Sequence, residues 1–197
     1  MRVTYVRKGH KPKAYTVNRA SGVNMYAGMC LHGVTKAHTV TGTTRQRESY
    51  KTKDGKPAKN ITTVEYEDVL KETLLPDGSR MFTQQHSQHV WILQQDGDGV
   101  HNDAKEVVAA WSKGRSSTIE VLSPWPPNSP DLNPIENVWS WVDARVQAKG
   151  CKSFDEFKEA VFTEFKAVPK QMLNRLVHSM PKRLDLVLKA KGARIRY

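Results

Sequence analysis

An α/β fold, with a mixed β-sheet flanked by helices and a helical C-terminal segment, is predicted for this chain of 197 residues. Three observations predict it. Two short apolar runs joined by a turn, Val23–Leu31 and Lys36–Thr41, indicate a β-hairpin. A third apolar run, His89–Asp96, is typical of a buried strand. Beyond residue 130, apolar residues recur mainly at helical spacing.

The length suits one domain spanning residues 1–197, with a sizeable core. Lys and Arg number 31 against 20 Asp and Glu, which gives a net charge of +11. Such a surplus favours a polyanionic partner through phosphate contacts, although a basic solubilising surface would give the same count.

Two cysteines are too few for a disulfide framework or a zinc site, so we expect a reducing compartment. The sequence has no apolar run of membrane-spanning length and no signal-peptide core. We therefore expect a soluble intracellular protein, nuclear in a eukaryote and otherwise cytoplasmic, with neither a membrane partner nor a small-molecule cofactor.

The N-terminal stretch 1–19 is basic and lacks acids, which fits either an arm contacting DNA through Arg7, Lys8 and Lys11 or a solvated terminus. Residues 43–60 are polar and predict a loop. Thr62 or Thr63 caps a predicted helix reaching about Leu74, which Pro76-Asp77-Gly78 ends.

After the His89–Asp96 strand, Asn102 or Asp103 caps a predicted helix that runs to Trp111, and Ile119–Leu122 is the next strand. Further helices are predicted from the apolar spacing of the C-terminal part. Their boundaries are set by Pro134, Gly150, Ser153, Pro169 and Gly192.

The proline-rich stretch Trp125–Trp139 fixes the path of the backbone into the helix at Pro134. Asn133 is the predicted N-cap and Glu136 the third helical residue. Glu136 then has two interpretations: a capping box with the Asn133 amide, or a carboxylate that binds metal. We expect Asp131 to order the proline turn rather than bind metal.

Asp96 ends the predicted strand, where open α/β sheets place their ligands, and Gly97-Asp98-Gly99 breaks the chain. Asp98 is the rival for a role in catalysis. We prefer Asp96 because it ends the strand directly, whereas the glycines place Asp98 on a loop.

Gln94-Gln95-Asp96-Gly97-Asp98-Gly99-Val100-His101 and Ser129-Pro-Asp-Leu-Asn-Pro-Ile-Glu-Asn-Val-Trp139 strongly resemble the catalytic core of mariner-superfamily DDE transposases. The resemblance implies an RNase H-like fold, with Asp96 as the second catalytic acid and Glu136 as the third. It also implies a two-metal site for Mg²⁺ or Mn²⁺, in which both acids are ligands. His101 matches a position near that site, as a phosphate contact or as a locally packed histidine.

In that family the first catalytic Asp lies on a central strand upstream of the hairpin matched to Val23–Thr41. Here the first acid of any kind is Glu48. We therefore expect an N-terminally truncated domain that lacks this strand, and with it the family's helix-turn-helix region. Loss of the strand would leave two inner sheet edges unpaired.

The resemblance predicts metal-dependent DNA strand cleavage and transfer as the ancestral reaction, impaired in this chain by the absent acid. The alternative is a non-catalytic DNA-binding remnant or domesticated protein that keeps the basic surface. A different RNase H-like nuclease is a distant third. The implied partner is DNA, both transposon ends and target, and a homodimer is the assembly to test.

Overall fold

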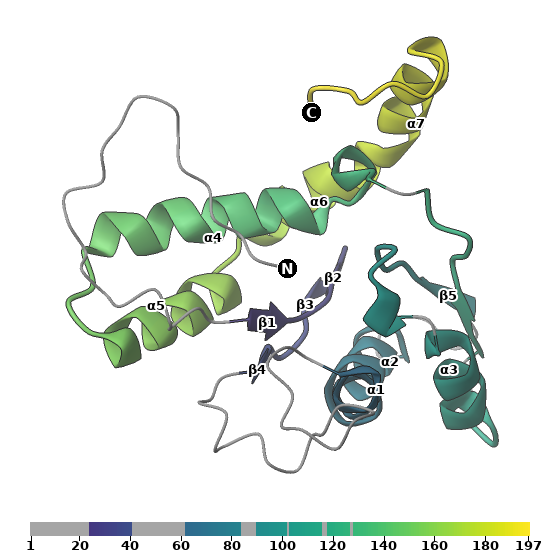
Figure 1. The fold of residues 1–197 in the computed structure, drawn as a ribbon, viewed down its shortest axis with the longest axis horizontal. Helices are drawn as coiled ribbons and strands as arrows, with labels where there is room; N and C mark the ends of the chain where they lie inside the picture. Colours follow the sequence, from purple (N-terminus) through teal and green to yellow (C-terminus); the bar gives the residue numbers. More distant parts are fainter. Residues whose placement is uncertain (1–23, 41–61, 84–89, 102, 116–117, 127) are drawn as a thin grey trace.

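The computed structural model describes residues 24–40, 62–83, 90–101, 103–115, 118–126 and 128–197 (Figure 1). The described strands are all short: β1 Asn24–Tyr26, β2 Met29–Cys30, β3 Gly33–Val34, β4 His38–Val40, β5 Val90–Leu93 and β6 Thr118–Val121. The α-helices are α1 Thr63–Val69, α2 Leu75–Thr83, α3 Ala104–Ser112, α4 Ile135–Lys149, α5 Phe154–Lys166, α6 Lys170–His178 and α7 Met180–Lys189. The basic stretch 1–19 and the polar loop 43–60 lie outside the described residues.

The predicted N-terminal hairpin is confirmed. Strand β1 pairs antiparallel with β4, and β2 pairs antiparallel with β3. The two ladders are separated by a local break. There the Gly28 amide donates to Oγ1 of Thr35 at 2.7 Å, and the Thr35 amide donates to the Gly28 carbonyl at 2.9 Å. At this break the Thr35 hydroxyl accepts the hydrogen bond that a backbone carbonyl would accept in a regular hairpin.

Strands β5 and β6 pair in parallel, but the prediction of a buried strand over His89–Asp96 is wrong in two respects. First, β5 ends at Leu93, so Asp96 follows on irregular backbone; His89 lies outside the described residues. Second, only one face is covered, because Trp91 is 7% exposed whereas Val90 and Ile92 are 55% and 59% exposed. Within the described residues no ladder joins β5 to β1, so the expected mixed sheet consists of separate pairs.

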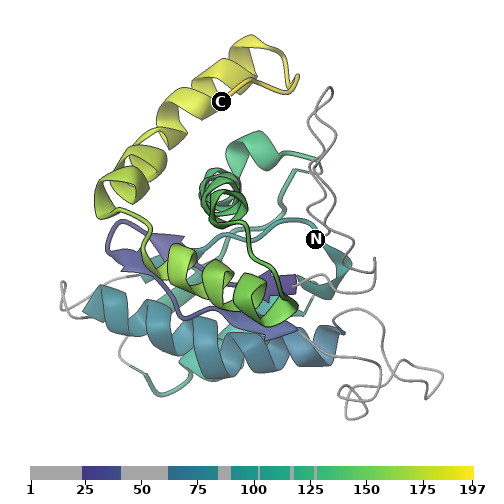
Figure 2. The same ribbon diagram turned by 90° about the vertical axis from the view of Figure 1, so that its left-hand side faces the viewer.

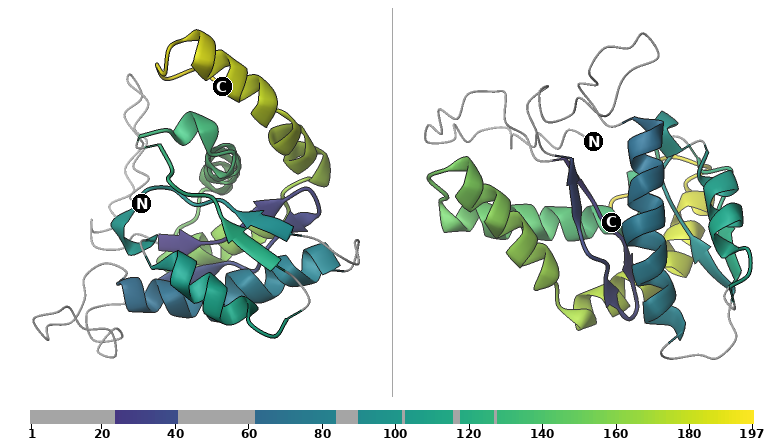
Figure 3. Two further views of the ribbon diagram at one scale, coloured as in Figure 1. Left: turned by 90° about the vertical axis from the view of Figure 1, so that its right-hand side faces the viewer. Right: turned by 90° about the horizontal axis from the view of Figure 1, so that it is seen from below.

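Two groups of apolar side chains form the core. One joins α1–α3 to β5 and β6, and the other joins α4–α6 to the hairpin. Because side chains alternate along a strand, Tyr26 of β1 packs against the first group and its neighbour Met25 against the second. The views in Figures 2 and 3 show the hairpin between α4–α5 on one side and α1–α2 on the other.

The helix predicted to end near Leu74 runs on to Thr83, so the predicted stop at Pro76-Asp77-Gly78 is wrong. Its start is confirmed, since Oγ1 of Thr62 accepts from the Glu65 amide at 3.2 Å. A π-helical turn over Leu70–Leu74 precedes the proline and makes room for a residue without an amide hydrogen. Tertiary contacts then outweigh the helix-breaking tendency of Pro76 and Gly78. Asp77 between them is buried, and its carboxylate accepts from the Lys36 amide at 2.6 Å.

The C-terminal helices follow the predicted signals closely. Gly150 ends α4 in the left-handed conformation with φ of 62°, and Oγ of Ser153 caps α5 by accepting from the Glu156 amide at 3.1 Å. Asp103 precedes α3 but makes no capping hydrogen bond through its side chain. Among the described segments, none of the helices combines the length and apolarity that crossing a bilayer requires.

Candidate active site

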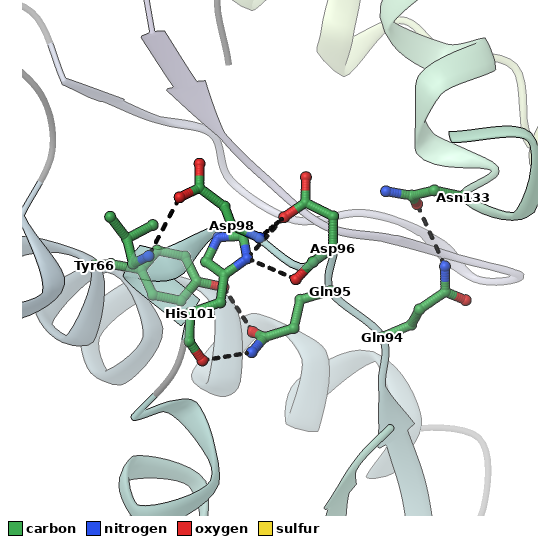
Figure 4. Close-up of polar contacts among 8 residues, drawn as sticks. Tyr66, Gln94, Gln95, Asp96, Asp98, His101 and Asn133 are labelled. Carbon is green, nitrogen blue, oxygen red and sulfur yellow. Dashed lines mark hydrogen bonds and ion pairs between the residues drawn. The ribbon is translucent and has the colours of Figure 1, made fainter. Parts of the chain in front are cut away.

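Asp96 lies on the segment that leaves β5, with its carboxylate held from two directions. Its Oδ1 accepts from the Asp98 amide at 3.2 Å and lies 2.9 Å from Nδ1 of His101 (Figure 4). The hydrogen bond from His101 lowers the pKa of Asp96; burial opposes this effect, and the Asp98 amide reinforces it. Asp96 is therefore an ionised carboxylate at neutral pH, with a side chain still 39% exposed.

His101 closes a single 3-10 turn, Gly99–His101, which folds the chain back towards Asp96. Its Nδ1 also lies 3.2 Å from the Asp96 carbonyl oxygen, so one N–H can be shared between the two acceptors. The ring packs on Tyr66 with centroids 4.3 Å apart, and the side chain is only 12% exposed. This geometry orients Asp96, while a phosphate contact by His101 stays a prediction.

Two side chains not singled out from the sequence, Tyr66 and Gln95, pack against and bond to this arrangement (Figure 4). The Tyr66 hydroxyl donates to Oε1 of Gln95 at 2.9 Å, and Nε2 of Gln95 donates to the His101 carbonyl at 3.1 Å. Burial and the nearby Asp96 charge raise the pKa of Tyr66, so its hydroxyl stays a donor. Gln95 stands inside the quoted motif, but no sequence signal places Tyr66 of α1 beside it.

Glu136 lies in the first turn of α4, and the structure speaks against one of its two interpretations, the capping box. The helix begins at Ile135 with Pro134 as the preceding residue, so the predicted N-cap at Asn133 is one residue early. The Asn133 amide donates to the Pro130 carbonyl at 3.1 Å, which uses the donor that a capping box requires. The Glu136 carboxylate therefore does not cap its own helix.

The surroundings of Glu136 disfavour its charge. Burial raises its pKa, and the negative charge of Asp96 raises it further. Asp96 and Glu136 are separated by 39 residues in the chain, yet they are near enough to repel each other. Two carboxylates whose pKa values are shifted in opposite directions are typical of catalytic acids and metal ligands.

Gln94 links the segment that carries Asp96 to the turn that carries Glu136. Its Nε2 lies 3.3 Å from the Leu132 carbonyl and 3.4 Å from Oδ1 of Asn133. Both are long contacts, yet they join the end of β5 to the residues just before α4 (Figure 4). The predicted motif residues are thereby brought to one place.

An open hollow of about 280 Å³ lies beside Asp96. Besides Asp96 it is lined by Asp98, His101, Lys105 and Trp125, among others, and Glu136 is not part of this lining. Oδ1 of Asp98 turns back to accept from the Val100 amide at 3.3 Å, which makes Asp98 a loop-ordering residue here. Lys105 places a positive charge in the same lining.

Hard divalent ions prefer carboxylate oxygens, and an ionised, half-exposed Asp96 near Glu136 fits that preference. Two carboxylates alone would form only a partial ligand set. Across the parts of the chain that the structure describes, no three His, Cys, Asp or Glu side chains gather as a metal site. Arg7, Lys8 and Lys11 lie outside those parts.

A model of the DDE superfamily endonuclease family matches residues 58–158, just over half of the chain. The chain belongs to this family. The matched region contains both Asp96 and Glu136. The transposable element Tcb1 transposase of Caenorhabditis briggsae is 31% identical over 132 residues, which cover 67% of this chain and 45% of that protein. This relative confirms the predicted resemblance to mariner-superfamily transposases, and the chain spans about half the length of the relatives it matches.

Solved structures confirm the predicted RNase H-like fold of this DDE endonuclease family member. A structure of the Mos1 transposase catalytic domain with Raltegravir and Mn has a TM-score of 0.59 at 16% identity, covering 88% of this chain and 83% of that one. A pre-cleavage Mos1 transpososome has a TM-score of 0.63 at 17% identity, covering 99% of this chain and 52% of that one. At such low identity these likenesses define the fold.

Proposed function

We propose that the chain carries two of the acids of a metal-dependent site for DNA strand cleavage and transfer, and that these acids are Asp96 and Glu136. One observation supports this most strongly. Burial and the charge of Asp96 together raise the pKa of Glu136, although the two lie on separate elements. Packing alone does not require two carboxylates to converge in this way.

Mg²⁺ or Mn²⁺ is the proposed cofactor, with Asp96 and Glu136 as its protein ligands. When bound, such ions activate the attacking oxygen and stabilise the leaving oxygen of an in-line displacement at phosphorus. Asp96 is ionised and oriented by His101, so it is ready to bind a cation. Glu136 gains most from a cation, because positive charge would relieve its repulsion by Asp96.

DNA is the proposed substrate. The net charge of +11 supports it, as does Lys105 at the hollow beside Asp96. The similar Mos1 chain was solved as a pre-cleavage transpososome. We also propose that residues 1–197 act as one catalytic domain.

Mn²⁺ binding to the purified 197-residue chain tests the two ligands. Free Mn²⁺ would be measured by electron paramagnetic resonance for the wild type, Asp96→Asn, Glu136→Gln and a control, Glu120→Gln, whose side chain is exposed on β6. We expect each active-site variant to bind about 10-fold or more weakly, since the ion depends on carboxylate oxygens. The control should bind as the wild type does.

Unchanged Mn²⁺ affinity in both active-site variants would overturn the assignment. If Asp98→Asn lost Mn²⁺ affinity and Asp96→Asn did not, Asp98 rather than Asp96 would be the metal ligand. Nicking of supercoiled plasmid in Mn²⁺ is the matching activity assay. We expect slow or absent nicking, and any nicking observed should disappear in both Asp96→Asn and Glu136→Gln.

A non-catalytic DNA-binding function is the second candidate. The observation that favours it is the combination of a net charge of +11 with only two converging acids in the described residues. Such a protein would bind duplex DNA with strong salt dependence and without any effect of Asp96→Asn or Glu136→Gln. Failure to bind duplex DNA at low salt would exclude it.

A further inference from the structure

Arg183 of α7 is the largest fully buried side chain in the described residues, with 1% of its surface exposed. All three of its nitrogens donate hydrogen bonds. Nε donates to Oγ of Ser179 at 2.9 Å, Nη1 to the Asp131 carbonyl at 2.8 Å and Nη2 to Oδ1 of Asn137 at 2.9 Å. One guanidinium thus joins α7 to the turn before α4 and to the first turn of α4 itself.

The position of these acceptors is informative. Asn137 follows Glu136 directly, and Asp131 lies in the 3-10 turn Pro130–Leu132 that leads into the helix. The guanidinium therefore bonds to the backbone of the turn before Glu136 and to the side chain of the residue directly after it. Its planar fork fixes directions as well as distances, which a lysine ammonium cannot do.

The C-terminal tail closes the same cluster. The Ile195 amide donates to Oδ2 of Asp131 at 2.8 Å, and the ring of Tyr197 lies 4.0 Å from the guanidinium carbon of Arg183. The expected role of Asp131, to order the proline turn, agrees with these contacts. On the opposite side, Gln94 reaches the same turn from the end of β5.

A buried cation is a costly way to fill space, because desolvation of the charge must be offset. The three acceptors named above are neutral oxygens, and the nearby Asp131 carboxylate offsets part of that cost. An apolar side chain of similar volume would pack between α7 and α4 without that cost. The hydrogen bonds that Arg183 makes instead are directional. Two of the three go to residues on either side of Glu136 in the sequence, and the third goes to Ser179 at the start of its own helix. This favours a role in geometry over a role in packing alone.

We propose that Arg183 is a positioning residue that fixes the start of α4, and with it the Glu136 carboxylate, relative to Asp96. The inference rests on the proposed metal site. The metal is held by Asp96 and Glu136, whereas Arg183 acts through Asp131 and Asn137 without touching it. Residues that orient metal ligands typically contribute about 10- to 100-fold to metal affinity.

The test compares full-length wild type with Arg183→Met, Arg183→Lys and Asn137→Ala, and with Lys182→Met as an exposed control on the same helix. Circular dichroism establishes folding, amide hydrogen exchange reports on residues 130–139, and electron paramagnetic resonance gives Mn²⁺ affinity. We expect Arg183→Met and Arg183→Lys to bind Mn²⁺ about 10- to 100-fold more weakly and to exchange faster in 130–139. Asn137→Ala should show a smaller loss and Lys182→Met none.

Folded Arg183 variants with wild-type Mn²⁺ affinity and wild-type exchange in 130–139 would overturn the positioning role. If Arg183→Met does not fold, Arg183→Lys and Asn137→Ala decide. The first keeps the positive charge and the aliphatic stem, and the second keeps the hydrogen bonds of Arg183 to Ser179 and Asp131. If the wild type itself binds no Mn²⁺, the proposed metal site fails. The exchange of 130–139 then still shows whether Arg183 holds the start of α4.

Discussion

At the scale of single residues, the two acids of the site have opposite environments. Asp96 gains a hydrogen bond from His101 that favours its charge, while Glu136 is half-buried beside that charge. A folded protein that lowers the pKa of one carboxyl and raises that of its neighbour favours one negative charge over two. A bound cation would favour the ionised form of both carboxyls, so the raised pKa of Glu136 in the metal-free protein is consistent with the proposed metal site.

Glu136→Gln should therefore stabilise the metal-free protein at neutral pH. Because folding raises the pKa of Glu136, its ionisation costs the folded state free energy, and glutamine removes that cost. The gain should be absent near pH 3, where Glu136 is protonated in both states. It should grow as the pH rises from about 4.3, the ordinary pKa of Glu, and level off above the raised folded pKa.

Thermal unfolding in the presence of a chelator, between pH 3 and pH 8, measures this difference. Solvent screening at a half-exposed site keeps the expected gain to about 1 kcal/mol or less. Glu120→Gln, on the exposed surface of β6, is the matched control and should show no such pH-dependent gain. A Glu136→Gln variant less stable than the wild type at pH 7 would contradict the prediction.

At the scale of elements, the helix pair α1–α2 carries the strongest disagreement between local sequence and structure. Pro76 and Gly78 are both helix breakers, yet the helix continues through them. Glycine fits at position 78 because the Trp91 side chain packs closely against the helix there: a Cβ on residue 78 would lie 2.9 Å from Cη2 of Trp91. That indole in turn stacks on Phe82 with ring centroids 5.4 Å apart, so it has little room to move.

Gly78→Ala should destabilise the fold, although alanine normally favours a helix by about 0.5–1 kcal/mol over glycine. The added methyl group would push Trp91 away from Phe82, and overpacking of this kind costs about 1–3 kcal/mol. Chemical denaturation monitored by tryptophan fluorescence measures the change. Glu72→Ala, at an exposed position of the same helical segment, is the control, and equal stability of the two variants would rule out the clash.

The sequence predicted most helices and the N-terminal hairpin because capping residues, turns and apolar spacing act locally. Ser153 and Gly150 are examples, since each does its work within one turn of its own helix. It could not predict that α2 follows α1, because the deciding contacts are with Lys36 and Trp91, far away in the chain.

The same limit applies to the candidate site. The motifs pointed to Asp96 and Glu136, and the structure brings their segments together. Tyr66, which packs on His101, and Arg183, which holds Asn137, are joined to the site only by tertiary contacts. Spacing patterns in the sequence cannot predict contacts between residues so far apart in the chain. The motifs identify the two acids, whereas the side chains that orient them are determined by the tertiary fold.

At the scale of the whole molecule, the arrangement of layers explains how segments far apart in sequence meet. The hairpin lies between the α4–α6 group and the α1–α2 helices, and it packs against both apolar groups. The C-terminal helix α7 then returns to the turn before α4 through Arg183. The candidate site thus depends on residues from α1, the segment after β5, α4 and α7 together.

The net charge of the whole chain predicts how it should bind DNA. With +11 charges we expect binding to duplex DNA of any sequence, governed by the release of counterions. If 6–10 phosphates are neutralised, affinity should fall by about 10³- to 10⁵-fold between 50 and 200 mM salt. Fluorescence anisotropy of a labelled duplex over a salt series measures the slope.

A charge-reversed variant, Arg7→Glu with Lys8→Glu and Lys11→Glu, tests whether the basic N-terminal stretch supplies part of this binding. We expect lower affinity and a shallower salt slope, because each lost phosphate contact reduces the slope by about 0.9. A matched reversal of three exposed lysines on α5–α7, Lys166, Lys170 and Lys182, separates this stretch from overall charge. Equal losses in the two variants would mean that net charge alone governs binding, whereas a larger loss in the N-terminal variant would identify a DNA-contacting arm.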